Sequence, residues 1–161
     1  MWYHTPTTLG NVHRAIVSFH HYFNQTLVPF TARPSKNELL KVADTVYALP
    51  FIFLTHTGTP TGGHDPIYNF GNEKALSVFG RTPAELLQFP SRLSAGPDER
   101  SRREAFMREV ATKGCVKDYD CIRVKKDGSP LKMWDGYVWN VRDEAGAIVG
   151  QAAMFKKWQD Q

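Results

Sequence analysis

The last third of the chain constrains the fold most, because its apolar residues follow a period of two there. After Gly114 the alternation predicts strands over residues 119–125, 131–142 and 148–158. The turn sequences KDG and DEAG join these segments and suit hairpin geometry. The segments therefore predict an antiparallel meander of three strands.

The middle segment predicts how such a sheet is oriented. Leu131, Met133, Tyr137, Trp139 and Val141 share one parity along it, and residues of one parity point to one face of a strand. We therefore expect one face of the sheet to be clearly the more apolar, with helices packed on it.

Two helices are expected ahead of the sheet. Apolar residues recur at spacings of three and four between residues 9 and 27, which fits one face of a helix. Ser35 and Glu38 have the spacing of a capping box, which opens a second helix. The two helices make residues 1–48 an N-terminal helical extension and leave residues 49–158 as the main domain.

The middle of the chain supplies two further strands and shorter helices. Runs rich in β-forming residues at 51–55 and 66–70 flank a loop and predict a hairpin. Capping signals predict helices over 72–80, from Thr82 onward, and over 97–113. Helices that cover one face of an antiparallel sheet make an α+β domain, and a small ligand can sit in the hollow between the two.

These elements and their residues resemble a PAS domain and, more narrowly, the MEKHLA domain, a family related to PAS domains. The general pattern lies in NEKALSVFGRTPAELL at 72–87, through Asn72, Ala75, Gly80, Glu85 and Leu86. The narrower match adds SFHHYFNQTL at 18–27, DPIYNFGN at 65–72, FPSRLSAGPDER at 89–100, DGYVWNVRDEAG at 135–146 and GQAAMF at 150–155. The resemblance implies a five-stranded antiparallel sheet with helices on one face and a sensory or interaction role, without a defined catalytic residue.

The charge balance argues against a nucleic acid partner. The chain carries 20 basic and 16 acidic residues, a net charge of +4, and the excess is spread thinly. In the densest stretch Arg100, Arg102, Arg103 and Arg108 alternate with acidic residues, which is typical of a solvated helix face with ion pairs. No apolar stretch approaches the roughly 20 residues of a membrane helix, and no signal peptide is recognisable. We therefore expect a cytoplasmic protein with neither a nucleic acid nor a membrane partner.

The histidines and cysteines form no recognisable metal or cofactor motif. His13 and His20 lie about 10 Å apart along a helix, too far for one zinc ion. PAS-like domains that bind haem commonly use a histidine on the long helix, and residues 101–113 contain none. Flavin photosensors of this type use a cysteine that residues 88–96 lack. Histidine-ligated haem on that helix and cysteinyl-flavin photochemistry are therefore disfavoured, and the cofactor stays unknown.

Polar or aromatic residues within apolar strands are the candidates for lining a pocket. They are Tyr68, Asn69, Trp139, Asn140 and Gln151. A buried amide needs hydrogen-bond partners, and a ligand or water in a hollow supplies them. Ordinary core packing or a backbone hydrogen bond explains each residue better when it is taken singly, so the prediction is that at least one lines the cavity.

The motifs of common enzymes are missing from the sequence. It contains neither a nucleophile elbow nor a phosphate-binding loop, and we assign no catalytic residue. The main hypothesis is a non-enzymatic sensory or interaction module that binds a small apolar or amphipathic ligand, a protein partner or both, with a homodimer expected. One alternative is a structural dimerisation module with a filled core. The other is a small enzyme of the cone-shaped α+β type, with Asp135 as its acid or base.

Overall fold

A computed structural model of the chain describes residues 1–58, 66–87, 89–95 and 100–161. Within these ranges one five-stranded antiparallel sheet is formed, in the order β2-β1-β5-β4-β3. The strands are β1 Ile52–Thr57, β2 Tyr68–Gly71, β3 Cys115–Val124, β4 Pro130–Arg142 and β5 Ile148–Asp160. The expected α+β fold is confirmed, and the three C-terminal strands form the predicted meander.

The helices are α1 Pro6–Phe23, α2 Lys36–Tyr47, α3 Glu73–Phe79, α4 Pro83–Leu86 and α5 Arg100–Lys113, with a 3-10 helix η1 at Ser91–Ser94. The helices α2, α3 and α4 begin where the capping signals predict, α1 begins ahead of the expected residue 9, and the start expected at residues 97–99 lies outside the described part of the chain. Ser35 and Glu38 form the full capping box of α2. Asn72 and Thr82 accept hydrogen bonds from the first turns of α3 and α4, and Gly80 ends α3 in the left-handed conformation.

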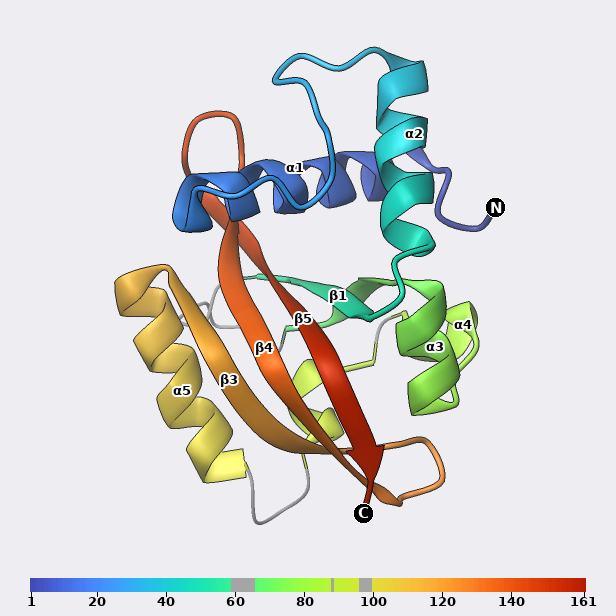
Figure 1. Cartoon of the computed structure of the whole chain (residues 1–161), viewed down its shortest axis with the longest axis vertical. Coiled ribbons are helices and arrows are strands. Elements are labelled where there is room, and N and C mark those ends of the chain that lie inside the picture. Colours follow the sequence, from blue (N-terminus) through green and yellow to red (C-terminus); the bar gives the residue numbers. More distant parts are fainter. Residues whose placement is uncertain (59–65, 88, 96–99) are drawn as a thin grey trace.

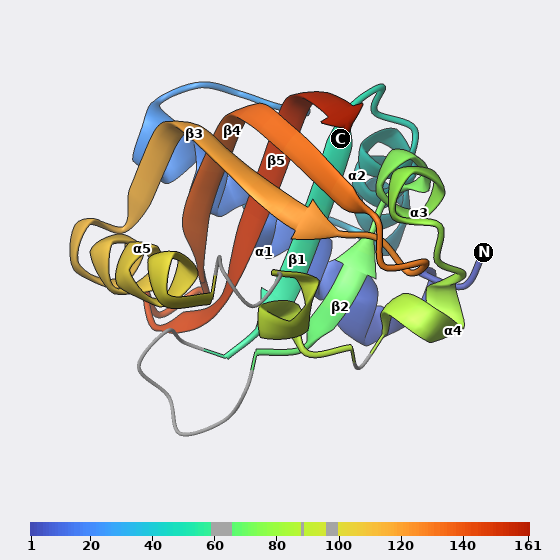
Figure 2. The same ribbon diagram turned by 90° about the horizontal axis from the view of Figure 1, so that it is seen from below.

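The sheet is covered on both faces. The helices α1 and α2 pack on one face, and Figure 1 shows α1 crossing β4 and β5 near the turn that joins them. Figure 2 shows η1 and α5 on the nearer side of the sheet, with α1 behind it. The N-terminal extension is therefore a second layer of the fold, joined to the sheet through one hydrophobic cluster.

The prediction that one face of the sheet is the more apolar was wrong. Leu131 and Met133 pack in the cluster of α3 and α4, whereas Trp139 and Val141 pack in the cluster of α1 and α2. The inside-outside alternation changes near Asp135, whose φ is 53°. A residue with left-handed backbone interrupts the pleat, so residues of one parity lie on different faces before and after it.

The indole of Trp139 ties the N-terminal layer to the sheet. Its Nε1 donates a hydrogen bond to the Ala15 carbonyl at 2.9 Å, and its side chain is fully buried. A buried indole needs such a partner, so this bond fixes α1 at one place along β4.

Within the described ranges, every helix is too short or too polar to cross a bilayer.

Asn72 joins three elements at the start of α3. Its Oδ1 accepts hydrogen bonds from the backbone N–H groups of Phe53 and Ala75, each at 3.0 Å. Its Nδ2 donates to the Phe51 carbonyl at 2.8 Å. Asn72 is fully buried. Without its side chain, water could not reach the backbone groups to form these hydrogen bonds instead.

Replacing Asn72 with alanine tests this junction. We expect Asn72→Ala to lower the free energy of unfolding by about 3 kcal/mol, since it removes a helix cap and leaves buried backbone groups unpaired. Urea denaturation measures the change. Asn37→Ala, at an exposed position of α2, is the control and should stay within about 0.5 kcal/mol of wild type. A similar small change in both variants would contradict the role given to Asn72.

Candidate functional site

A small cavity of about 50 Å³ lies between the sheet and the helices η1 and α5. Its walls combine apolar side chains with buried polar and charged groups. The lining residues are Leu54, His56, Tyr68, Phe79, Ser91, Arg103, Phe106, Met107, Tyr119, Arg123, Met133, Val138, Gln151, Ala152, Ala153 and Phe155. Since about 10–15 Å³ of such space holds one water, the cavity has room for a few waters or a very small molecule.

Arg103 enters this cavity from α5. Its side chain is only 7% exposed, and Nη2 donates a hydrogen bond to the Ser91 hydroxyl at 2.5 Å. The prediction of a solvated helix face was therefore wrong at this position. Arg103 lies four and seven residues before Met107 and Val110, which places it on the buried side of the helix. Burial, together with the nearby charge of Arg123, lowers the pKa of the guanidinium from its ordinary value.

Arg123 reaches the same cavity from β3 and is 9% exposed. Its Nη1 donates to the Ile122 carbonyl at 3.2 Å, and Nη2 donates to the Tyr119 hydroxyl at 3.5 Å. Among the residues that the structure describes, no carboxylate lies within salt-bridge distance of Arg103 or Arg123. A buried guanidinium without a counter-charge is costly, because burial removes its hydration.

Gln151 and His56 lie side by side on β5 and β1 and line the cavity. Gln151 is 2% exposed, and its Nε2 has no hydrogen-bond partner among the described residues. His56 is 8% exposed, and its ring Nδ1 lies 3.0 Å from the Thr57 carbonyl. Burial lowers the pKa of His56 from 6.5 to about 4, so its ring is neutral at pH 7.

The structure brings together two of the five candidate pocket residues. Tyr68 and Gln151 line the cavity. Asn69 accepts a hydrogen bond from the Thr55 hydroxyl, and Asn140 donates from Nδ2 to the Val110 carbonyl at 3.3 Å; neither lines the cavity. Trp139 lies on the opposite face of the sheet, where it packs against α1.

Sequence reasoning missed Arg103, Arg123 and His56 as cavity residues. The spacing of Arg103 to the apolar residues of α5 was a usable signal, as was the parity that Arg123 shares with buried Cys121. The sequence places His56 and His64 on either side of one loop, but His64 lies outside the described residues.

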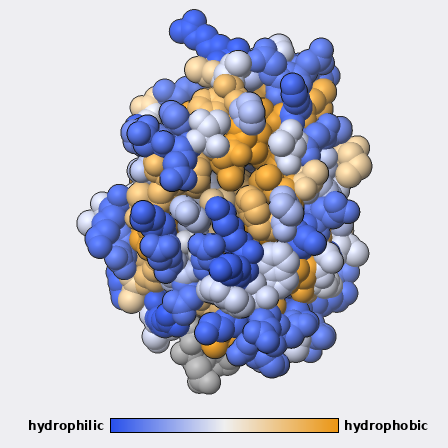
Figure 3. Space-filling view, viewed as in Figure 1, coloured by the Kyte–Doolittle hydropathy of each residue, from blue (hydrophilic) through white to orange (hydrophobic). Residues whose placement is uncertain are grey.

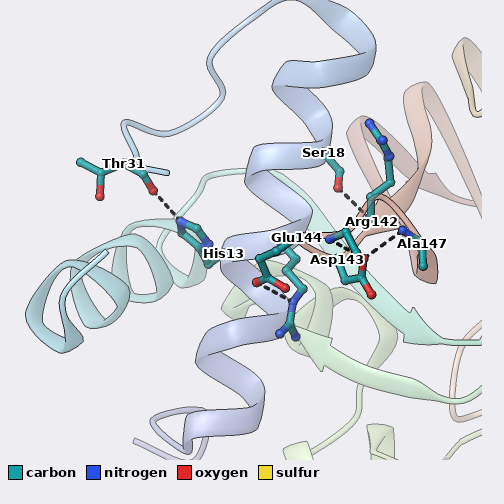
Figure 4. Close-up of polar contacts among 9 residues, drawn as sticks. His13, Ser18, Thr31, Arg142, Asp143, Glu144 and Ala147 are labelled. Carbon is teal, nitrogen blue, oxygen red and sulfur yellow. Dashed lines mark hydrogen bonds and ion pairs between the residues drawn. The ribbon is translucent and has the colours of Figure 1, made fainter. Parts of the chain in front are cut away.

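A second hollow of about 330 Å³ lies between α1 and the turn that joins β4 to β5. Figure 4 shows its polar groups already paired with one another. Arg14 Nε donates to Glu144 Oε1 at 3.2 Å, and the Arg142 N–H donates to the Ser18 hydroxyl at 2.9 Å. These contacts hold α1 against the turn, and the small cavity is therefore the better candidate for a ligand site.

The strand order β2-β1-β5-β4-β3, with helices between β2 and β3, defines a PAS-like fold. A PAS domain from Colwellia psychrerythraea is similar to the chain, with a TM-score of 0.60 and 12% sequence identity over 74% of this chain and 95% of that one. The sequence matches the MEKHLA domain over residues 11–160, so the chain belongs to the MEKHLA domain family. No curated protein sequence matches the chain.

Two light-oxygen-voltage structures are also similar. One, from work on a flavin analogue in such a domain, has a TM-score of 0.58 and 16% identity over 75% of this chain and 84% of that one. The other, an RNA-binding light-oxygen-voltage receptor, has a TM-score of 0.59 and 17% identity over 81% of this chain and 36% of that one. At these identities the likeness establishes the fold alone, and the absence of a nucleic acid partner stays a prediction.

The cavity does not fit a flavin or a haem. Sites for ligands of drug size usually enclose about 300–1,000 Å³, whereas bulky residues such as Phe106, Met133 and Phe155 leave about 50 Å³ here. The helix α5 carries no histidine, and the cysteines lie elsewhere, on β3 at Cys115 and Cys121. In the described part of the chain, no three metal-ligating side chains gather at one point.

The low pKa of His56 predicts a pH dependence of stability. Because the unfolded chain binds a proton near pH 6.5 and the folded chain only near pH 4, stability falls as the pH drops through this window. Between pH 7.5 and 5.5 this group lowers the free energy of unfolding by about 1.3 kcal/mol. Urea denaturation at both values measures the fall.

The variant His56→Asn is the control for this prediction. Asparagine does not titrate, so the pH-dependent fall should be smaller in the variant by about the same 1.3 kcal/mol. An equal fall in the variant and the wild type would show that His56 titrates normally in the folded chain.

Proposed function

We propose that the chain is a non-enzymatic sensory or interaction module of the PAS type, which binds a small molecule in the cavity beneath the sheet. One observation carries this proposal. Buried Arg103 and Arg123 line the cavity without a carboxylate partner among the described residues, and the Nε2 of buried Gln151 has no hydrogen-bond partner among them. Buried polar groups are normally paired, and a ligand is one way to pair them.

A structural module with a filled core is the first rival. The small size of the cavity favours it. Against it stands the cost of keeping two guanidinium groups in a core that apolar residues of similar volume would stabilise better. This cost favours a site that is kept for a ligand.

An enzyme of the cone-shaped α+β type is the second rival. It needs an acid or base in the cavity, and Asp135 is not among the cavity-lining residues. The neutral ring of His56 alone gives no acid and base pair. We therefore propose no catalytic residue. We expect an Asp135→Asn variant to match the wild type in any assay of turnover.

The cavity and the N-terminal helices contact neighbouring residues of the same strand, β5. Gln151 lines the cavity, whereas the next residue of β5, Ala152, is also part of the cluster that contains α1 and α2. We propose that a ligand shifts β5 slightly and so changes how these helices lie.

The N-terminal helices are the proposed contact surface for a homodimer or another protein partner. Figure 3 shows apolar side chains gathered over α1, α2 and the segment between them. Half-buried Leu27, Phe30 and Leu40 belong to these segments. Sedimentation at two protein concentrations tests the homodimer, and a monomer at both would contradict it.

A cytoplasmic location stays a prediction.

Native mass spectrometry of the full chain, purified from its own cells, tests the ligand. We expect a mass above that of the denatured chain, from a retained small molecule. Ala153→Val should lose the extra mass, because its added methyl groups occupy the cavity that Ala153 lines. Val149→Leu, at an exposed position of the same strand, should keep it. No extra mass in the wild type, with a cavity that holds only water in a crystal structure, would contradict the proposal.

A further inference from the structure

The cavity carries an excess of positive charge. Arginine stays protonated at neutral pH, so Arg103 and Arg123 bring two cations to one small space. Burial is the main cause of the lowered pKa of Arg103, and the nearby charge of Arg123 lowers it further. Burial also acts to lower the pKa of Arg123, but Cys121 and the nearby tyrosines together raise it above its ordinary value. In the described ranges neither guanidinium pairs with a carboxylate.

The uncharged polar groups around the arginines include one buried donor without a partner among the described residues and hydroxyl groups that pair with one another. The Gln151 Nε2 is buried and unpaired among the described residues, and it belongs to a side chain that lines the cavity. The Tyr68 hydroxyl lies 3.1 Å from the Ser94 hydroxyl, which itself donates to the Ser91 carbonyl at 2.6 Å. The two guanidinium groups and the Gln151 amide are donors that an acceptor-rich ligand would pair.

The remaining walls are apolar and close. Leu54, Met133, Val138 and Phe155 line the cavity beside the charged groups. The volume of about 50 Å³ limits a ligand to a few non-hydrogen atoms unless side chains move. An anion with a short apolar tail satisfies the charge, the donors and these walls together.

We propose that the ligand of this cavity is a small monocarboxylate, held by Arg103 and Arg123 with Gln151 as a further donor. The proposal rests on the proposed function, since it names the chemical class of the ligand at the same site. Guanidinium groups match carboxylate oxygens in geometry as well as charge. The carboxylate supplies a counter-charge that the described residues do not, and a short alkyl tail contacts the apolar walls.

The four methionines allow a direct test by NMR. Met107 and Met133 line the cavity, Met154 is buried in the cluster of the N-terminal helices, and Met1 is exposed. The full chain, labelled at its methionine methyl groups, is denatured, dialysed free of small molecules and refolded. Acetate, its neutral analogue acetamide and the cation methylammonium are then added separately at constant ionic strength.

We expect acetate alone to shift the methyl signals of Met107 and Met133, and to do so saturably, while Met1 and Met154 stay in place. Four non-hydrogen atoms limit acetate to a dissociation constant of about 40 µM or weaker. Arg103→Gln and Arg123→Gln should each weaken binding about tenfold or more, since each removes a charged hydrogen-bonding partner. Arg108→Gln, at an exposed position of α5, should bind as wild type does.

The position of the Met154 signal shows whether each variant is folded, and the comparison of acetate with acetamide needs no variant at all. Equal binding of acetamide, or binding of methylammonium, would overturn the proposal. So would the absence of any shift with acetate and with propionate. If mass spectrometry then still finds a retained molecule, the class of ligand is wrong and the proposed function stands; if it finds none, both are wrong.

Discussion

Burial of both faces of one antiparallel sheet is the constraint on which the rest of this structure depends. Antiparallel sheets commonly leave one face to water, and their strands then alternate apolar with polar residues. Here β1, β4 and β5 carry apolar residues on both faces, which only two helical layers can cover. The layer of α1 and α2 is therefore part of the fold, and its contacts, such as that of Trp139 with Ala15, are core contacts.

This constraint also explains what the sequence predicted well and what it did not. The caps of α2, α3 and α4 depend on residues three positions apart, so local spacing was enough to find Ser35, Asn72 and Thr82. The change of alternation within β4 depends on the left-handed backbone of Asp135. Aspartate adopts that conformation occasionally, and no local pattern in the sequence marked this position.

The candidate site was predicted only in part, because local sequence patterns reveal some buried polar residues and conceal others. Tyr68 and Gln151 were found because a polar group in an apolar strand is conspicuous. Arg103 was missed because it lies within a run of alternating charges, which usually marks a solvated helix. Its spacing of four and seven residues from buried Met107 and Val110 indicates the buried side of the helix instead. The periodicity of the helix was therefore the better guide to the burial of Arg103.

The similarity to PAS-like structures explains the place of the cavity but not its contents. In this chain the sheet order and the helices between β2 and β3 place the cavity between the sheet and the helices. What the hollow binds depends on the side chains that enter it, and at identities of 12–17% these are not shared by inheritance of the fold alone. In this chain two arginines from α5 and β3 enter a space that bulky apolar residues have made small. Among the described residues neither guanidinium meets a carboxylate, and burying such groups costs stability, which is the physical reason for which we propose a binding site here.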